Sequence, residues 1–249
     1  MPPPRFFILA AIVLCSNAVE AVTGFGSTII AVTLGAHFYP IDRLVVILVP
    51  VNIVLSSYIV IRHREAVNAR ELFRGILPAS GAGLAVGIAV FHLAEVDTLR
   101  IAYGTFVLCL SVREVHIALR TAGDFSPKPL PGLQSFFWLL SGGIMQGIYA
   151  SGGPMVVYYA GRKLTDKRSF RSTLSGLWLI LSTALFASHV VSGKATIGTL
   201  RESAGLLASL ALGIVIGETI HERIPEKTFR VFVFAILIFA GAALILRAR

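Results

Sequence analysis

The sequence predicts an all-α polytopic membrane protein built from two inverted repeats, and three observations lead to this fold class. The chain has 249 residues, of which 55% are hydrophobic and 14% charged, and its mean hydropathy is +0.80. Its apolar residues fall in long blocks, with the charged residues gathered between them. Each half of the chain also begins with an apolar block that is interrupted by glycine. Because roughly 20 mainly apolar residues can cross a bilayer as a helix, the blocks are interpreted as membrane helices.

The first block runs from Phe6 to Phe38 and is interrupted at Thr23-Gly24-Phe25-Gly26-Ser27. Its 33 residues would make one helix of about 50 Å, whereas the hydrocarbon core of a bilayer is about 30 Å thick. Glycine is tolerated in membrane helices where neighbouring groups satisfy the freed backbone. We therefore expect the block to form a re-entrant or broken helical hairpin of two half-helices.

Six ordinary spans complete the predicted topology, three after the first block and three after a second interrupted block. The second block is Leu133 to Tyr159, with the interruption Ser151-Gly152-Gly153-Pro154. The six predicted spans are Leu44 to Ile61, Ile76 to Phe91, Ile101 to Val112, Leu174 to Val191, Ala204 to Ile220 and Val231 to Leu246. No soluble segment longer than about 20 residues separates them, so residues 1–249 are predicted to form a single transmembrane domain.

The two halves superpose weakly with a shift of 128 to 130 residues, which predicts repeats at 5–120 and 132–249. The matched residues are Asn17 with Gln146, Glu20 with Tyr149, Gly24 with Gly153, and Gly83 to Gly87 with Gly213 to Gly217. The apolar stretch from Met1 to Ala21 resembles a signal peptide, but its pattern recurs in the second half. We therefore expect it to belong to the fold.

The positions of the 22 Lys and Arg residues favour the inverted arrangement. If both interrupted blocks turn back, 15 of these residues lie on one side and 7 on the other; if each block crosses once, the division is 12 to 10. Since basic residues accumulate in cytoplasmic loops, both termini are predicted to be periplasmic. A tilted, kinked single helix stays as the alternative. We therefore attribute the net charge of +9 to basic residues in cytoplasmic loops. The expected partner is the lipid bilayer and not nucleic acid. A homodimer stays open.

The two interruptions are predicted to meet near the middle of the membrane and to bind a small anion. Helix starts offer unpaired N–H groups and a positive dipole end, which suit an anion without placing a full charge in the bilayer. Close packing of small residues is the alternative. The predicted substrate-binding residues are Asn17, Thr23, Gly24, Phe25, Gly26, Ser27, Gln146, Tyr149, Ser151, Gly152 and Gly153.

Glu20 is the candidate for proton coupling, because an ionisable residue at membrane depth is expensive and is by default a functional candidate. The alternative is that Glu20 lies in a wetter vestibule or caps a helix end. Polar residues also lie within two predicted spans, where they either join helices or line a pathway. They are Asn52, Ser56 and Ser57 in the first half, with Ser182 and Thr183 at roughly equivalent positions of the second half.

Enzyme signatures are absent from the sequence: it contains no HExxH, no GxSxG, no Walker loop, and no aspartate within the spans. Cys15 and Cys109 are far from any metal-binding spacing. We therefore predict no enzymatic activity, no cofactor and no metal site.

Three stretches of the sequence resemble the sulfite exporter TauE/SafE family of membrane permeases. They are Gly24-Phe25-Gly26, the segment Gly147-Ile148-Tyr149-Ala150-Ser151-Gly152-Gly153-Pro154, and the basic loop leading into Arg171-Ser172. The resemblance implies a permease of the bacterial inner membrane for sulfite or an organosulfonate. Many members look richer in glycine where this chain has Gly-Phe-Gly-Ser, which leaves the substrate open. The expected function is a secondary transporter, with proton coupling through Glu20 as a further hypothesis and an uncoupled anion channel as the alternative.

Overall fold

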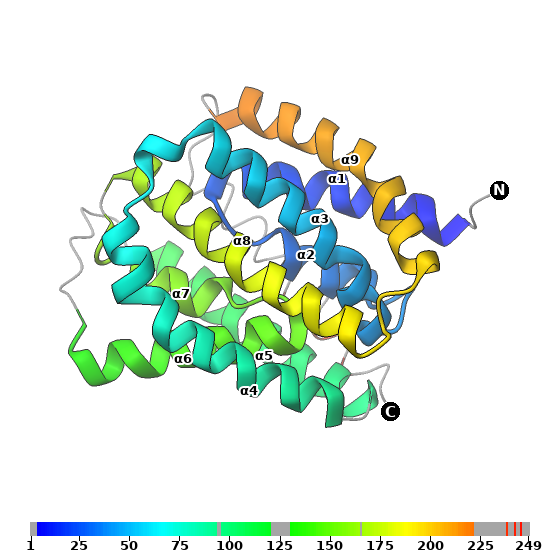
Figure 1. Ribbon diagram of the computed structural model, residues 1–249, viewed down its shortest axis with the longest axis horizontal. Helices are drawn as coiled ribbons and strands as arrows, with labels where there is room; N and C mark the ends of the chain where they lie inside the picture. Colours follow the sequence, from blue (N-terminus) through cyan, green and yellow to red (C-terminus); the bar gives the residue numbers. More distant parts are fainter. Residues whose placement is uncertain are drawn as a thin grey trace.

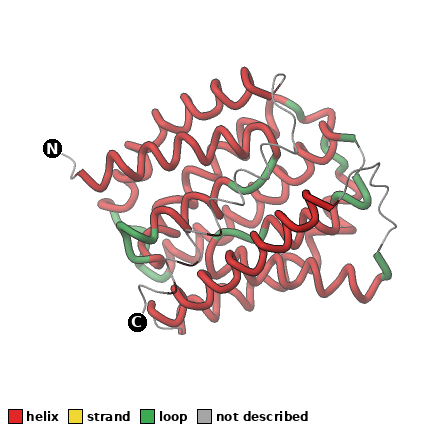
Figure 2. The backbone as a smooth tube through the Cα atoms, turned by 180° about the vertical axis from the view of Figure 1, so that it is seen from behind, coloured by secondary structure: helices red, strands yellow, loops and turns green. Residues whose placement is uncertain are grey.

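The structure is a computed structural model that describes residues 4–93, 96–120, 130–164 and 166–221, together with positions 238, 242 and 245. Within these residues the secondary structure consists of helices and contains no strand, which confirms the all-α part of the predicted fold class (Figures 1 and 2). The helices are α1 (Pro4–Thr23), α2 (Ser27–Gly35), α3 (Ile41–Arg62), α4 (Leu77–Leu93), α5 (Val96–Arg120), α6 (Gly132–Tyr149), α7 (Gly153–Ala160), α8 (Lys167–Val191) and α9 (Ile197–His221). The predicted span from Val231 to Leu246 lies outside the described ranges.

Five helices in the described residues are long and apolar enough to cross a membrane. They are Pro4–Thr23, Ile41–Arg62, Glu71–Leu93, Lys167–Val191 and Ile197–Thr219. A shorter apolar stretch, Ile101–Arg113, lies within α5. Large apolar side chains on α9, such as Leu212 and Val215, are exposed, as expected of a helix that faces lipid. The chain is therefore a multi-pass membrane protein.

Both interrupted blocks form helical hairpins in which the chain turns back. Gly35, at the end of α2, lies beside Leu9 near the start of α1, and the Arg5 guanidinium lies 5.4 Å from the centre of the Tyr39 ring. The second hairpin closes in the same way, because the rings of Trp138 on α6 and Tyr158 on α7 have centroids 4.4 Å apart. Each break therefore reverses the direction of the chain.

The two arms of each hairpin differ in length, so the expectation of two half-helices needs correction. The helix α1 has 20 residues, or about 30 Å, which is long enough to cross a membrane, whereas α2 has 9. The helix α6 has 18 residues and α7 has 8. The arms differ because each break follows a helix that is nearly long enough to cross the membrane, so only a short helix runs back from the break.

Helices from the two halves pack against each other in a reciprocal way. The most extensive contacts join α4 to α6, α1 to α9, and α3 to α8. The helices α3 and α8 lie side by side in the centre of Figure 1 and run in opposite directions, since Asn52 meets Ser182 and Asn68 meets Thr173. The first helix of each half thus packs on a helix of the other half. The helix α1 packs on α9, and α6 packs on α4, the helix of the first half that matches α9.

Glycines at the α4–α6 and α1–α9 contacts fix how the halves correspond. A Cβ atom on Gly83 would lie 2.1 Å from the carbonyl oxygen of Leu140, and one on Gly213 would lie 2.6 Å from that of Leu14. The glycines are 130 residues apart, but their partners are only 126 apart. The first helices of the two halves therefore correspond at a shift of 126 residues.

This register corrects the sequence-based pairing around the breaks. A shift of 126 pairs Glu20 with Gln146 instead of Tyr149, and Gly24 with Ala150 instead of Gly153. The backbone agrees, because Gly24 has φ 81° and Ala150 has φ 52°. Weak similarity between halves did not resolve an offset of three residues.

The α4–α6 contact predicts that Gly83→Ala destabilises the protein, while Gly81→Ala on the same helix does not. The new methyl group at position 83 would meet backbone atoms of α6, whereas a Cβ at position 81 meets nothing within 4 Å. Overpacking of this kind costs about 1–3 kcal/mol. The measurement is the free energy of unfolding in detergent micelles. Equal stability of the two variants would contradict this account of the contact.

Candidate functional site

The first break is the turn Gly24-Phe25-Gly26 between α1 and α2. Gly24 and Gly26 have φ values of 81° and 100°, in the left-handed region that glycine adopts without a steric penalty. The Thr23 hydroxyl donates to the carbonyl oxygen of Phe25 at 2.7 Å, and the indole N–H of Trp178 on α8 donates to that of Gly24 at 3.3 Å. Side chains thus replace the helical hydrogen bonds that the break removes.

The second break is the turn Ala150-Ser151-Gly152 between α6 and α7. Ala150 is left-handed, with φ 52°, and is the sole non-glycine residue of the described chain with a positive φ. Gly152 packs so closely on α6 that a Cβ atom would lie 2.1 Å from the carbonyl oxygen of Gly142. Pro154 occupies the first turn of α7, where its missing N–H costs no helical hydrogen bond.

The two breaks touch each other in the interior of the bundle. A Cβ atom on Gly153 would lie 3.5 Å from the Phe25 ring, at ordinary contact distance. Tyr103, a buried residue of α5, places its hydroxyl 3.2 Å from the carbonyl oxygen of Ile29 and 3.4 Å from the Ser151 hydroxyl. The two interruptions therefore lie in contact with each other, as predicted.

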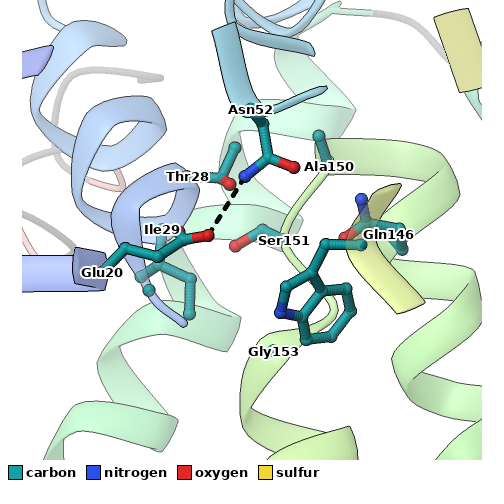
Figure 3. A pocket seen from close by; sticks show the side chains of 10 residues that line it. Glu20, Thr28, Ile29, Asn52, Gln146, Ala150, Ser151 and Gly153 are labelled. Atoms are coloured by element: carbon teal, nitrogen blue, oxygen red, sulfur yellow. Dashed lines mark hydrogen bonds between the residues drawn. The ribbon is translucent and has the colours of Figure 1, made fainter. Parts of the chain in front are cut away.

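A buried carboxyl group organises the first break. One oxygen of Glu20 accepts hydrogen bonds from the backbone N–H of Ser27, at 2.9 Å, and from the Ser27 hydroxyl. The other oxygen accepts from the side-chain amide of Asn52 on α3, at 3.3 Å (Figure 3). Glu20 is only 2% exposed, so these contacts take the place of water.

The same row of hydrogen bonds continues to the second break. The Asn52 carbonyl oxygen accepts from the Ser182 hydroxyl at 3.0 Å, and the Ser182 oxygen accepts from the Gln146 amide at 3.2 Å. The Gln146 carbonyl oxygen accepts from the backbone N–H of Gly152 at 3.1 Å. The row therefore ends at each side on a backbone N–H at or next to the start of a short helix. Glu20 and Gln146, which correspond at the shift of 126, hold these two ends.

A small polar cavity lies between the breaks. Its lining comes from both hairpins and from α3 and α8 (Figure 3). The lining residues are Glu20, Gly26, Thr28, Ile29, Asn52, Gln146, Ala150, Ser151, Gly153 and Trp178. The cavity offers about 20 Å³ to the centre of a water-sized sphere, which is room for one water molecule. A sulfur oxyanion is larger than water, so the cavity must widen to hold one.

Several predicted site residues line this cavity, and others support it from behind. Those in the lining are Glu20, Gly26, Gln146, Ser151 and Gly153. Ser27 lines a neighbouring cavity and holds Glu20, and Asn17 lines that same neighbouring cavity while its amide donates to the carbonyl oxygen of Val13 at 2.6 Å. The predicted residues that do not line the central cavity also include Thr23, Gly24, Phe25, Tyr149 and Gly152.

Five lining residues were not among the predicted site residues: Thr28, Ile29, Asn52, Ala150 and Trp178. Of these, Asn52 was expected only to join helices or to line a pathway. Thr28 and Ile29 belong to the first turn of α2, so the predicted start of a helix could have pointed to them. By the geometry of any helix start, their N–H groups have no partner within α2. Trp178 comes from α8, and no sequence signal connects it with the breaks.

The cavity lining combines hydrogen-bond donors with one carboxyl group. Hydroxyl groups of Thr28 and Ser151 and the free N–H groups at the start of α2 are hydrogen-bond donors at one cavity. The positive end of a helix dipole stabilises a negative charge there. The carboxyl group of Glu20 also lines the cavity, beside the start of α2, and already accepts hydrogen bonds from its own partners.

Comparison with known proteins adds one finding. Residues 8–244 match the family model described as sulfite exporter TauE/SafE. Comparisons with curated proteins and with solved structures return no match. The family match spans both breaks and includes all of the α-helices from α2 to α9, together with α1 from its fifth residue.

The row of hydrogen bonds predicts that Ser182→Ala destabilises the protein and that Ser56→Ala does not. Removing the Ser182 hydroxyl leaves the Asn52 carbonyl and the Gln146 amide without this partner, which costs about 1 kcal/mol or more. Ser56 on α3 is equally buried, but its hydroxyl has no hydrogen-bond partner among the described residues. The measurement is the free energy of unfolding in detergent micelles. An equal decrease of this free energy in both variants would contradict a structural role for the row.

Proposed function

The chain belongs to the sulfite exporter TauE/SafE family, and on this premise we propose that it is a secondary transporter of a small oxyanion across the cytoplasmic membrane. The substrate class is sulfite or an organosulfonate. The observation that carries the proposal is the meeting of two broken hairpins at one cavity lined by hydrogen-bond donors (Figure 3). Broken helices at matching places in two halves are typical of transporter binding sites.

Recognition would rest on neutral donors. The Ser151 and Thr28 hydroxyl groups and the first N–H groups of α2 would each donate to an oxygen of the anion. Backbone donors are held by the fold, so they need little reorganisation when the anion binds. A site of this kind suits the pyramidal arrangement of three oxygens around sulfur that sulfite and sulfonates share.

Alternating access would require one half to move against the other. The room for a single water molecule between the breaks fits a closed state in the cycle. The reciprocal packing and the opposite directions of α3 and α8 support an inverted-repeat architecture, in which the site lies between two halves that rock. Together with the excess of basic residues in the loops on one side, this architecture would place both termini in the periplasm.

Proton coupling would use Glu20. Its carboxyl group is buried, lines the cavity and joins the row of hydrogen bonds through Ser27 and Asn52. A change in its protonation would alter which partners donate to it, and so would act on the start of α2 and on α3 together. An anion next to Glu20 would be repelled by the ionised carboxylate and tolerated by the neutral acid, which couples the two binding events.

Reconstitution of the purified protein into vesicles tests the function. With an imposed pH gradient we expect labelled sulfite to accumulate against its concentration gradient. The Glu20→Gln variant keeps hydrogen-bonding capacity but cannot release a proton. It should therefore lose at least about tenfold of the gradient-driven accumulation while it still exchanges labelled for unlabelled sulfite. Sulfoacetate, taurine and thiosulfate as competitors define the substrate.

The control is Glu65→Gln, which changes an exposed carboxylate outside the helices that line the cavity. It should behave as the wild type. Full accumulation by Glu20→Gln would overturn the coupling role of Glu20. Ohmic anion current far above carrier rates, without accumulation, would replace the transporter by an uncoupled channel.

A further inference from the structure

Arg171 lies at the edge of the first break and outside the central cavity. It is the fifth residue of α8, and its backbone packs directly on the break, because a Cβ atom on Gly24 would lie 3.0 Å from the Arg171 Cα. Its side chain is only 14% exposed. A guanidinium group is thus buried beside the turn that shapes the cavity.

Two nitrogen atoms of this guanidinium, Nε and Nη2, are buried and have no hydrogen-bond partner among the described residues. Their N–H groups point in the same direction along one edge of the planar group. This is the edge with which arginine binds two oxygens of one carboxylate, phosphate or similar oxyanion. Buried donors to which no acceptor is supplied are costly, and a charged donor more so than a neutral one.

Glu218, the carboxylate that forms an ion pair with Arg171, does not hydrogen-bond to this edge. Glu218 on α9 places an oxygen 4.0 Å from Arg171 Nη2, which is an ion pair at long range and no hydrogen bond. The same Glu218 oxygen accepts from the Tyr58 hydroxyl at 3.1 Å. Arg43, near the start of α3, provides a contrast, because it contacts Glu202 at 2.6 Å. The carboxylate next to Arg171 compensates part of its charge and leaves the paired donors open.

The position of Arg171 suits an anion that approaches the cavity. Ser182, in the central row of hydrogen bonds, lies 11 residues further along α8, or about 16 Å. Arg171 lies at the end of the bundle where α8 begins and α3 ends, which the distribution of basic residues predicts to be cytoplasmic. Burial, and then the Arg171 charge, lower the pKa of His63 just beyond α3, so the positive field of Arg171 extends over this end.

We propose that the Nε/Nη2 edge of Arg171 is a second oxyanion-binding site, which holds the anion between the predicted cytoplasmic side and the cavity at the breaks. The ligand class is an oxyanion with at least two oxygens that accept side by side. The passage from this site to the cavity rests on the proposed transport function, whereas binding at Arg171 does not.

The test uses the full-length protein in vesicles of known orientation, with sulfite offered from one side at a time. Arg171→Lys keeps the charge and loses the paired donors, and Arg171→Gln loses both. We expect both variants to raise KM at least tenfold for sulfite offered from the Arg171 side and to leave KM from the opposite side unchanged. Glu218→Gln should lower KM on the Arg171 side, because it removes a competing negative charge. Arg74→Gln, an exposed arginine, should leave both values unchanged.

Two results would overturn the second site. The first is an unchanged KM in both Arg171 variants. The second is a rise in KM for Glu218→Gln equal to the rise for Arg171→Gln, because this would show that Arg171 serves only a structural ion pair with Glu218. If the wild type moves no oxyanion, the proposed function fails, and binding alone decides about the second site. Sulfite should then raise the melting temperature of the wild type in detergent more than that of Arg171→Lys. An equal rise in both would overturn the site.

Discussion

A row of hydrogen bonds through an apolar bundle is the interaction on which the other features depend. In a membrane no lipid can satisfy a broken helix, so each freed N–H group must find a partner in the protein or face a polar cavity. Here the partners are side chains: Glu20 holds the start of α2, Gln146 holds the turn before α7, and Asn52 and Ser182 join the two. Two interruptions that would be costly separately are thereby satisfied as one unit.

This unit explains why the cavity lies where it does. Asn52 and Ser182 belong to α3 and α8, the central antiparallel pair, so the row crosses the contact between the two halves. Any movement of one half against the other must act on this row, and a ligand at the cavity would border three of its members, Glu20, Asn52 and Gln146. In the proposed transport cycle, binding and movement would therefore share the same contacts, which is the physical requirement for coupled transport. Arg171 extends the unit outward, since the turn that Glu20 stabilises also packs on Arg171.

The sequence predicted the helices well, because apolar blocks and glycine interruptions act locally. The described helices cover seven of the eight predicted apolar blocks, and both interruptions coincide with the observed breaks. The correspondence of the halves was three residues out around the breaks, where Ala150 takes the left-handed conformation that Gly24 has in the first half. A pairing of glycine with glycine misled the alignment, since the backbone at this position tolerates alanine at a cost. The register is fixed by the contact between Gly83 and Leu140. This is a tertiary contact between two helices, so it cannot be predicted from either segment of the sequence by itself.

The site was predicted in part for the same reason. Residues at the interruptions were found because polar and small residues within apolar blocks are conspicuous, and five of them line the cavity. Their individual roles depended on side-chain direction. The Thr23 hydroxyl and the Asn17 amide turn to backbone oxygens of their own segment, while Trp178 reaches the break from another helix. Such directions follow from packing between distant elements, which the sequence alone does not give.

The most direct test of the central claim, that the two breaks form one anion site, is an experimental structure of the complete protein with selenite, a heavier analogue of sulfite. The expected result is anomalous scattering from selenium between the breaks, within hydrogen-bond distance of the Ser151 hydroxyl and the first N–H groups of α2, in a cavity wider than the one in Figure 3. Selenium bound away from both breaks, with the row from Glu20 to Gln146 unchanged, would contradict it.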